Sequence, residues 1–224
     1  MPWIKKGINR IIPSVIWQPH SQVLITLQRL PDDSLILDIG AGGRQISPNV
    51  IGVDFIPFEN TKLISDIHNL AFANESVDAV FCTGTLEHVN NPNQAMREIY
   101  RILKPKGIVH IEVPFIQPFH KDPEDYWRWT LDGLRLFAVQ HNFEEIRSGS
   151  LIGPASAMNA LIIAYFQSWF RNRYIRKLID FMLSYILFPF KFLDVVLLNR
   201  NIDLISAFFY VGIKPKVIDN ELQA

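Results

Sequence analysis

Hydrophobic positions along this chain fall into two alternating patterns. Short apolar runs rich in strand-forming residues predict seven strands, over residues 35–38, 50–54, 63–67, 76–82, 108–113, 142–147 and 206–214. Apolar residues at helical spacing predict amphipathic helices over 19–30, 93–103 and 131–139. Strands that alternate with helices are typical of an α/β fold with a largely parallel sheet.

The stretch before the last predicted strand breaks this alternation. No charge occurs from Ser148 to Phe170, a basic cluster covers 171–177, and a second apolar run spans 181–190. About fifty residues are far more than a hairpin needs, so we predict a helical insert over 148–205. A membrane span is rejected because the first run contains Gly153 and Pro154, and because a single crossing would separate the last strand from its sheet.

Two interpretations of the insert remain. It is either a helical cap that encloses an apolar acceptor, or a surface that lies on a membrane with the basic cluster against anionic lipid. We favour peripheral membrane contact through residues 148–200, or a lipid-linked acceptor. The basic cluster consists of Arg171, Arg173, Arg176 and Lys177.

Composition narrows the classes of partner. The chain has 224 residues with 22 basic and 22 acidic side chains, so it lacks the basic footprint of a nucleic-acid-binding protein. The single cysteine, Cys82, cannot form an internal disulfide, which favours a cytoplasmic location. Membrane association is expected from the insert and not from the cysteine. The first eighteen residues are expected to form a loose arm, and their short apolar run, broken by Pro13, does not match a secretory signal.

A glycine-rich loop follows the first predicted strand directly. The sequence Asp38-Ile-Gly40-Ala-Gly42 places a carboxylate beside glycines that allow positive φ and close approach of a ligand. A dinucleotide fingerprint would need a third glycine where Gln45 stands. A carboxylate at the mouth of this loop suits a cationic ligand better than a diphosphate.

At these residues the chain resembles the class I S-adenosylmethionine-dependent methyltransferases, and in particular their type 11 branch. The resemblance runs from about 35 to 143. It includes Leu86-Glu87-His88-Val89 and the run from Glu98 to Gly107, in which Lys106 replaces a glycine of the family. It implies a doubly wound, Rossmann-like, seven-stranded sheet with the last strand antiparallel, here with the helical insert before that strand. It also implies S-adenosyl-L-methionine as the cofactor.

The cofactor site is expected at successive strand ends. Asp54 ends the second strand, where an acidic residue accepts hydrogen bonds from ribose hydroxyls. The resemblance assigns Asp66 and Ile67 to the adenine. The competing interpretation is that the three aspartates, Asp38, Asp54 and Asp66, only form turns in an ordinary α/β domain. The predicted cofactor-binding residues are Asp38, Gly40, Ala41, Gly42, Asp54, Phe55, Asp66, Ile67, Thr83 and Leu86.

The connection from the glycine loop to the second strand is short. About ten residues, with Pro48 among them, allow a helix of a turn or two at most. We therefore expect loop backbone to hold the carboxylate end of the ligand.

The acceptor site is expected in the long aromatic loop over 114–130, because substrate sites form at the carboxyl ends of strands in open α/β sheets. His120 is the preferred catalytic base and His88 the second candidate, although His88 could equally bind only loop backbone. The predicted acceptor-binding residues are Glu87, Tyr126, Trp127, Arg128 and Trp129.

Alternative roles for this loop stay open. The aromatic side chains could pack the loop against the domain while Arg128 bridges an aspartate. The irregular spacing of His120, Asp122 and Asp125 is weak evidence for a metal, and none is predicted.

The sequence thus predicts one methyltransferase domain over 1–224. Its parts are an N-terminal arm and helix (1–34), a cofactor-binding core (35–147), the apolar helical insert (148–205) and the last strand (206–214). The expected activity is methyl transfer to oxygen or nitrogen of a small molecule, glycan or lipid-linked acceptor. The alternatives are carbon methylation of a quinone-like ring, or a non-catalytic methyltransferase-like scaffold at the membrane.

Overall fold

The computed structural model describes residues 16, 21–120, 123–198 and 203–216. The predicted N-terminal arm therefore lies, apart from Ile16, outside the described residues. The chain forms two compact units: a core unit of 21–114, 121–149 and 208–224, and an insert unit of 1–20, 115–120 and 150–207.

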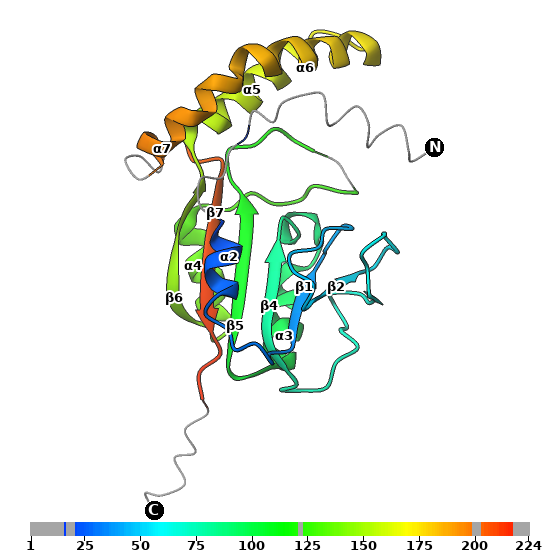
Figure 1. Ribbon diagram of the computed structural model, residues 1–224, viewed down its shortest axis with the longest axis vertical. Helices are drawn as coiled ribbons and strands as arrows, with labels where there is room; N and C mark the ends of the chain where they lie inside the picture. Colours follow the sequence, from blue (N-terminus) through cyan, green and yellow to red (C-terminus); the bar gives the residue numbers. More distant parts are fainter. Residues whose placement is uncertain (1–15, 17–20, 121–122, 199–202, 217–224) are drawn as a thin grey trace, which may run out of the picture. The chain divides into compact units, whose positions relative to one another are not determined.

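The core unit is built on a seven-stranded sheet in the order β3-β2-β1-β4-β5-β7-β6 (Figure 1). Strands β1 to β5 run parallel to one another. Hydrogen bonds join residue 106 to 214 and 115 to 206, so β7 runs antiparallel to β5, which confirms the predicted doubly wound fold. The strands are β1 (Ile36–Ile39), β2 (Val50–Asp54), β3 (Leu63–Ile64), β4 (Val77–Thr83), β5 (Leu103–Pro114), β6 (Glu144–Ile152) and β7 (Ala207–Ile213).

Three helices cover this sheet, with α2 in front of it in Figure 1 and α3 and α4 behind it. They are α2 (Gln22–Leu27), α3 (Pro92–Ile102) and α4 (Leu131–Gln140). Each begins at a side chain that accepts a backbone N–H of the first turn, and these caps are Ser21, Asn91 and Thr130. The apolar stripe of α3 is fully buried, as its spacing predicts.

The core departs from the sequence prediction at three places. No helix forms between β1 and β2. Strand β3 has two residues rather than five, because Asp66 turns away to pair with Asn69. Strand β5 begins at Leu103, and Lys106 within it has a φ of +68°, the left-handed conformation that the family's glycine would adopt without strain.

The insert unit contains two long helices, α5 (Pro154–Ser168) and α6 (Arg173–Leu187), followed by a 3-10 helix, η2 (Phe188–Leu193), and a single turn, α7 (Asp194–Leu197). This confirms a helical insert before the final strand. No helix among the described residues is long and apolar enough to cross a membrane.

A buried carboxylate fixes the start of α5. Asp194 is fully buried, and its carboxylate accepts the backbone N–H groups of Ala155 (2.8 Å) and Ser156 (3.0 Å) and the Ser156 hydroxyl (2.6 Å). These bonds satisfy N–H groups that a helix leaves without intrahelical partners. Gly153 makes the approach possible, because a Cβ atom there would lie 2.3 Å from Asp194 Oδ1.

Gly153→Ala should therefore lower the free energy of unfolding by about 1–3 kcal/mol, the usual cost of an added methyl group in a filled site. In an Asp194→Gly background the same change should cost less than about 0.5 kcal/mol, because the close contacts with Oδ1, Cγ and Cβ of Asp194 are all gone. Urea unfolding of the four proteins measures this coupling. Gly149→Ala, whose Cβ would meet only a ring 3.5 Å away, is the matched control. Equal costs in both backgrounds would contradict the assignment.

Candidate functional site

Three carboxylates converge at the carboxyl edge of the parallel strands. Asp38 and Asp54 stand at the ends of β1 and β2, and Glu112 pairs with Thr83 near the ends of β5 and β4. Burial raises the pKa of Asp38, and the charges of Glu112 and Asp54 raise it further. The predicted acids of the first two strands therefore lie at one edge of the sheet, together with a third acid.

Arg44 balances the buried Asp38. Its Nη2 lies 2.7 Å from Asp38 Oδ1 and its Nε 3.1 Å from Oδ2, a bidentate pair that opposes the rise in the pKa of Asp38. The Asp38 side chain is 1% exposed, whereas the Arg44 side chain is 41% exposed. Arg44 Nη1 also donates to the Thr83 carbonyl at 3.4 Å, so the guanidinium joins the ends of β1 and β4.

The glycine loop is shaped by positive φ angles and by one tight contact. Gly40 has a φ of +72° and Gly42 of +56°. A Cβ at Gly40 would lie 2.3 Å from the Thr85 side chain, so any other residue would displace it. The N–H groups of Gly40 and Ala41 both donate to the Val53 carbonyl, which holds the loop against the end of β2.

Asp54 ties this loop to the following one. Its Oδ2 accepts the Gly42 N–H at 2.8 Å, and its Oδ1 accepts the Ile56 N–H at 3.0 Å. A carboxylate offers about four acceptor positions, so each oxygen can accept a further hydrogen bond. The neighbouring Phe55 side chain is exposed.

The two residues predicted to bind the adenine, Asp66 and Ile67, lie at or near the surface. The Asp66 side chain is exposed, and its Oδ1 accepts the His68 N–H at 2.9 Å and lies 2.7 Å from His68 Nδ1. The hydrogen bond from the His68 backbone lowers the pKa of Asp66. Ile67 is half-buried beside it.

The segment after β4 carries the next predicted residues. Thr83 and Leu86 are buried, and Leu86 opens a short 3-10 helix, η1 (Leu86–His88). Glu87 is buried, and its carbonyl accepts the Tyr126 N–H at 2.7 Å. His88 Nδ1 donates to the Glu124 carbonyl, and its Nε2 lies 3.8 Å from Glu87 Oε1.

The aromatic part of the acceptor loop is anchored on one side and exposed on the other. Trp127 Nε1 donates to the Val89 carbonyl at 2.8 Å, and the Trp129 ring packs 4.8 Å from Phe137. Tyr126 and Trp127 keep about half of their surfaces exposed, at 52% and 41%. This leaves aromatic surface that a planar or apolar group could contact.

Arg128 binds Asp125 through both guanidinium nitrogens, one of them at 2.7 Å from Oδ2, and this pairing raises the pKa of Arg128. This ion pair agrees with the alternative in which Arg128 bridges an aspartate. A role of Arg128 in binding the acceptor stays a prediction. Asp122, the other acid weighed near His120, lies outside the described residues.

His120 belongs to the insert unit, whereas His88 belongs to the core unit. The half-buried His120 has its Nδ1 3.2 Å from the Pro118 carbonyl.

Sequence reasoning missed several residues of this edge. It assigned no role to Arg44, Thr85 or Glu112. Glu112 in turn lies 3.0 Å from Nε2 of the fully buried His110, whose Nδ1 meets the Thr26 hydroxyl at 2.9 Å. Glu112 and His110 share the sheet face of Phe81 through the two-residue period of β5, and this periodicity was the available signal.

Comparison with known families identifies the central segment. Residues 37–111 match the family model described as a methyltransferase domain. This segment contains the glycine loop, both edge carboxylates of β1 and β2, and most of β5. No curated protein matches the sequence.

Solved structures share the fold at low sequence identity. A protein described as a sarcosine dimethylglycine methyltransferase from Galdieria sulphuraria aligns with a TM-score of 0.56, 16% identity, and coverage of 86% of this chain and 82% of that one. The [4+2]-cyclase SpnF aligns with a TM-score of 0.56, 14% identity, and coverage of 95% and 94%.

A third similar structure is that of Haemonchus contortus phosphoethanolamine N-methyltransferase 2 in complex with phosphomonomethylethanolamine and S-adenosylhomocysteine. It aligns with a TM-score of 0.53 and 19% identity, covering 87% of this chain and 52% of that one. Because a cyclase shares the fold with methyltransferases, the fold alone does not determine the reaction.

Arg44→Met should leave the buried Asp38 without its counter-charge and lower the free energy of unfolding at pH 7 by about 1–2 kcal/mol, a value reduced for the exposure of the guanidinium. At a pH below about 4, aspartates are protonated in both states and the deficit should be small. The deficit should grow as the pH rises through the raised pKa of Asp38, because the ionised carboxylate is then buried without a counter-charge in the folded variant, whereas water solvates it in the unfolded state.

Denaturant unfolding between pH 4 and 8 measures this deficit. Arg97→Met is the control, because Arg97 is exposed and, among the residues that the structure describes, donates only to Gln94. A deficit that does not change with pH would show that Arg44 acts by packing and not by charge.

Proposed function

We propose that this chain, whose residues 37–111 match the model of a methyltransferase domain, is an S-adenosylmethionine-dependent methyltransferase that methylates an oxygen or nitrogen atom of a lipid-linked acceptor. The observation that carries the acceptor class is the exposed apolar surface of the insert helices, which stands beside a basic cluster. The cofactor is inferred from the methyltransferase domain, and the acceptor class is inferred from the insert helices.

The residues of the core edge fit this cofactor. S-adenosylmethionine has a ribose, an ammonium and a sulfonium, and no phosphate. The edge supplies the carboxylates of Asp54 and Glu112 for a cationic ligand, because Asp38 is already paired with Arg44. Gly40 has a positive φ, and its close contact with Thr85 leaves room for glycine alone. Asp54, with acceptor capacity left on both oxygens, would receive the ribose hydroxyls.

When bound, S-adenosylmethionine supplies a methyl group activated by the positive sulfur. The protein has to hold the acceptor atom in line with that methyl group, and positioning of this kind can account for a large part of the rate. Asp54 and the loop from Gly40 to Gly42 would orient the nucleoside. A base is needed only if the acceptor atom carries a proton that must leave. His120 is proposed for that role and His88 as the second candidate.

The acceptor loop would hold the acceptor group. Tyr126 and Trp127 offer exposed aromatic surface, and Trp129 and the pair Arg128–Asp125 stiffen the loop behind them. The buried Glu87 anchors the same loop through its carbonyl.

Both insert helices expose large apolar side chains at helical spacing. On α5 the exposed stripe comprises Met158, Leu161, Tyr165 and Trp169, and on α6 it comprises Tyr174, Leu178, Phe181 and Tyr185. The buried residues of these helices are mostly small, among them Ser156, Ala157 and Ser184. This is the reverse of the usual arrangement, in which large apolar residues are buried.

Such a surface suits the boundary of a lipid bilayer. Exposed apolar patches of this kind mark interaction sites, and aromatic and basic residues next to them are typical of helices that lie in a membrane interface. The cations of the basic cluster complement anionic lipid. Peripheral membrane contact would bring the chain to a lipid-linked acceptor.

Asp54→Ala should weaken binding of S-adenosylhomocysteine, expected in the micromolar range for wild type, by roughly tenfold or more, because two hydrogen bonds to a charged group are lost. Isothermal titration calorimetry measures this. An analogue without ribose hydroxyls should bind wild type more weakly and should lose little further affinity to the substitution. Asp132→Ala is the control, since that side chain is 95% exposed. Unchanged affinity in Asp54→Ala would remove Asp54 from the site.

Wild-type protein incubated with methyl-tritiated S-adenosylmethionine and a membrane fraction should transfer label to an organic-soluble product. The apolar part of a lipid-linked acceptor carries the label into the organic phase. The same protein should float with vesicles that contain anionic lipid. If the acceptor is a hydroxyl, His120→Gln should lower the rate of transfer, because the variant has no imidazole to remove the hydroxyl proton.

The control for transfer is Asp54→Ala, which should lower labelling by roughly tenfold or more at a cofactor concentration below the wild-type Kd. Label that remains entirely in water-soluble products would overturn the lipid-linked acceptor while leaving the methyltransferase assignment intact. Protein that stays unbound to vesicles would overturn membrane contact.

A further inference from the structure

We infer that a cavity within the insert unit binds the phosphate-type anionic group of an amphipathic lipid, with Arg171 and Arg176 as the anion-binding residues. This inference rests on the proposed lipid-linked acceptor and names the chemistry of its head group. The cavity, its cations and its apolar wall each contribute to the argument.

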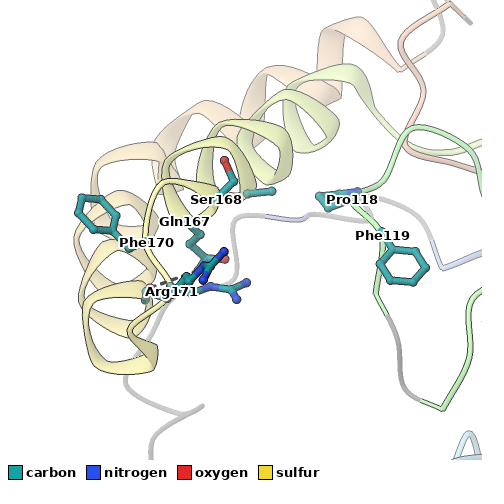
Figure 2. A pocket seen from close by; sticks show the side chains of 8 residues that line it. Pro118, Phe119, Gln167, Ser168, Phe170 and Arg171 are labelled. Atoms are coloured by element: carbon teal, nitrogen blue, oxygen red, sulfur yellow. Dashed lines mark hydrogen bonds between the residues drawn. The ribbon is translucent and has the colours of Figure 1, made fainter.

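The cavity has a volume of about 580 Å³, within the range of small-molecule sites. Figure 2 shows Pro118 and Phe119, from the segment after β5, on one side and the end of α5 on the other. All residues that line it belong to the insert unit, and they are Pro118, Phe119, Ala164, Gln167, Ser168, Phe170, Arg171 and Arg176.

Neither arginine of the cavity forms an ion pair within the part of the chain that the structure describes. The Arg176 backbone is nevertheless fixed, because its N–H donates to the Asn172 carbonyl at 3.1 Å and its carbonyl accepts from Gln167 Nε2 at 3.3 Å. A guanidinium on a fixed backbone, without an acidic partner, is available for an anion.

The position of these cations on α6 strengthens the argument. Helix N-termini carry a partial positive charge and usually attract acidic residues. The first turn of α6 has no acidic residue, while Arg171, Arg173, Arg176 and Lys177 lie in or beside it. Four like charges at the positive end of a helix repel one another, and a bound anion would offset that repulsion. Guanidinium groups bind phosphate oxygens in bidentate geometry.

The rest of the cavity lining suits the alkyl chain of a lipid and not a free inorganic ion. Phe119 is 72% exposed and Phe170 is 39% exposed, so both present apolar surface. With Pro118 and Ala164 they form the apolar part of the lining. An anionic head on the arginines with an alkyl chain along these side chains would use both parts of the cavity.

The basic cluster provides its own matched control. Arg171 and Arg176 line the cavity. Arg173 does not: its guanidinium lies 4.9 Å from the Tyr174 ring and donates to the Tyr174 hydroxyl at 2.9 Å. Lys177 does not line it either. Arg171→Gln/Arg176→Gln and Arg173→Gln/Lys177→Gln therefore remove the same charge from the same turn, one pair inside the cavity and one outside it.

The test is binding of monomeric dodecyl phosphate to the full chain, measured by calorimetry, with inorganic phosphate and an uncharged dodecyl glycoside as separate arms. Wild type should bind dodecyl phosphate at least tenfold more tightly than either. Arg171→Gln/Arg176→Gln should lose tenfold or more of that affinity, and Arg173→Gln/Lys177→Gln less than threefold. Arg176→Lys, which keeps the charge without the planar fork, should fall between them.

Three outcomes would overturn the site. Equal losses in the two double variants would mean diffuse attraction to the whole cluster. Equal binding of the glycoside would mean that the chain alone is recognised, and equal binding of inorganic phosphate would mean an anion site that does not recognise a lipid. These measurements need no methyl transfer. Labelled lipid product without dodecyl phosphate binding would reject the site and keep the proposed function, whereas binding without labelled product would do the reverse.

Discussion

The hydrogen bond from the Gly42 N–H to Asp54 is the interaction on which the candidate cofactor edge depends. Its 2.8 Å contact joins the loop after β1 to the end of β2. It is possible because the parallel register places Asp38 opposite Gly52, two residues before Asp54. The connection between these strands has no helix, so no helix N-terminus organises the loop. A single carboxylate does this instead, and it leaves acceptor capacity for a ligand.

Asp38 adds an electrostatic constraint to that geometry. A buried carboxylate without a partner is costly, and Arg44 from the same loop compensates it. Arg44 can do so because the loop returns across the strand ends instead of entering a helix. The absence of the helix and the presence of the ion pair are thus two consequences of the same short connection. A cationic ligand at this edge would meet the remaining carboxylates, Asp54 and Glu112.

The sequence was sufficient for the order of strands and helices, because apolar periodicity reports directly on which face of an element is buried. It placed Asp38 and Asp54 at strand ends, since each closes an apolar run. It could not reveal Arg44 as the partner of Asp38, because a loop has no fixed period that brings one side chain to another. Asp66 shows the same limit: the run 63–67 looked like a strand, but the exposed carboxylate pairs with His68 and ends it.

The insert shows a different limit of sequence patterns. A period of 3.6 residues predicts a stripe on a helix but not what covers that stripe. In α5 and α6 the buried residues are mostly small and many of the large apolar ones are exposed, so the stripe is available to a partner that is itself apolar. Ser156 and the Asp194 cap show part of the reason: the first turn of α5 is committed to polar contacts with a buried carboxylate.

The net charge of zero conceals a separation of charge along the chain. Residues 150–207 contain six basic and three acidic side chains, and two of those acids, Asp180 and Asp194, are bound to serines within the insert unit. The core edge, by contrast, gathers carboxylates around Asp38. Each unit therefore carries the charge opposite to that of the molecule proposed for it: the acidic edge suits a sulfonium and an ammonium, and the basic insert suits an anionic head group. A transfer between two such substrates requires that neither bind in the place of the other, and this opposition of charge provides that discrimination without a specific contact to either.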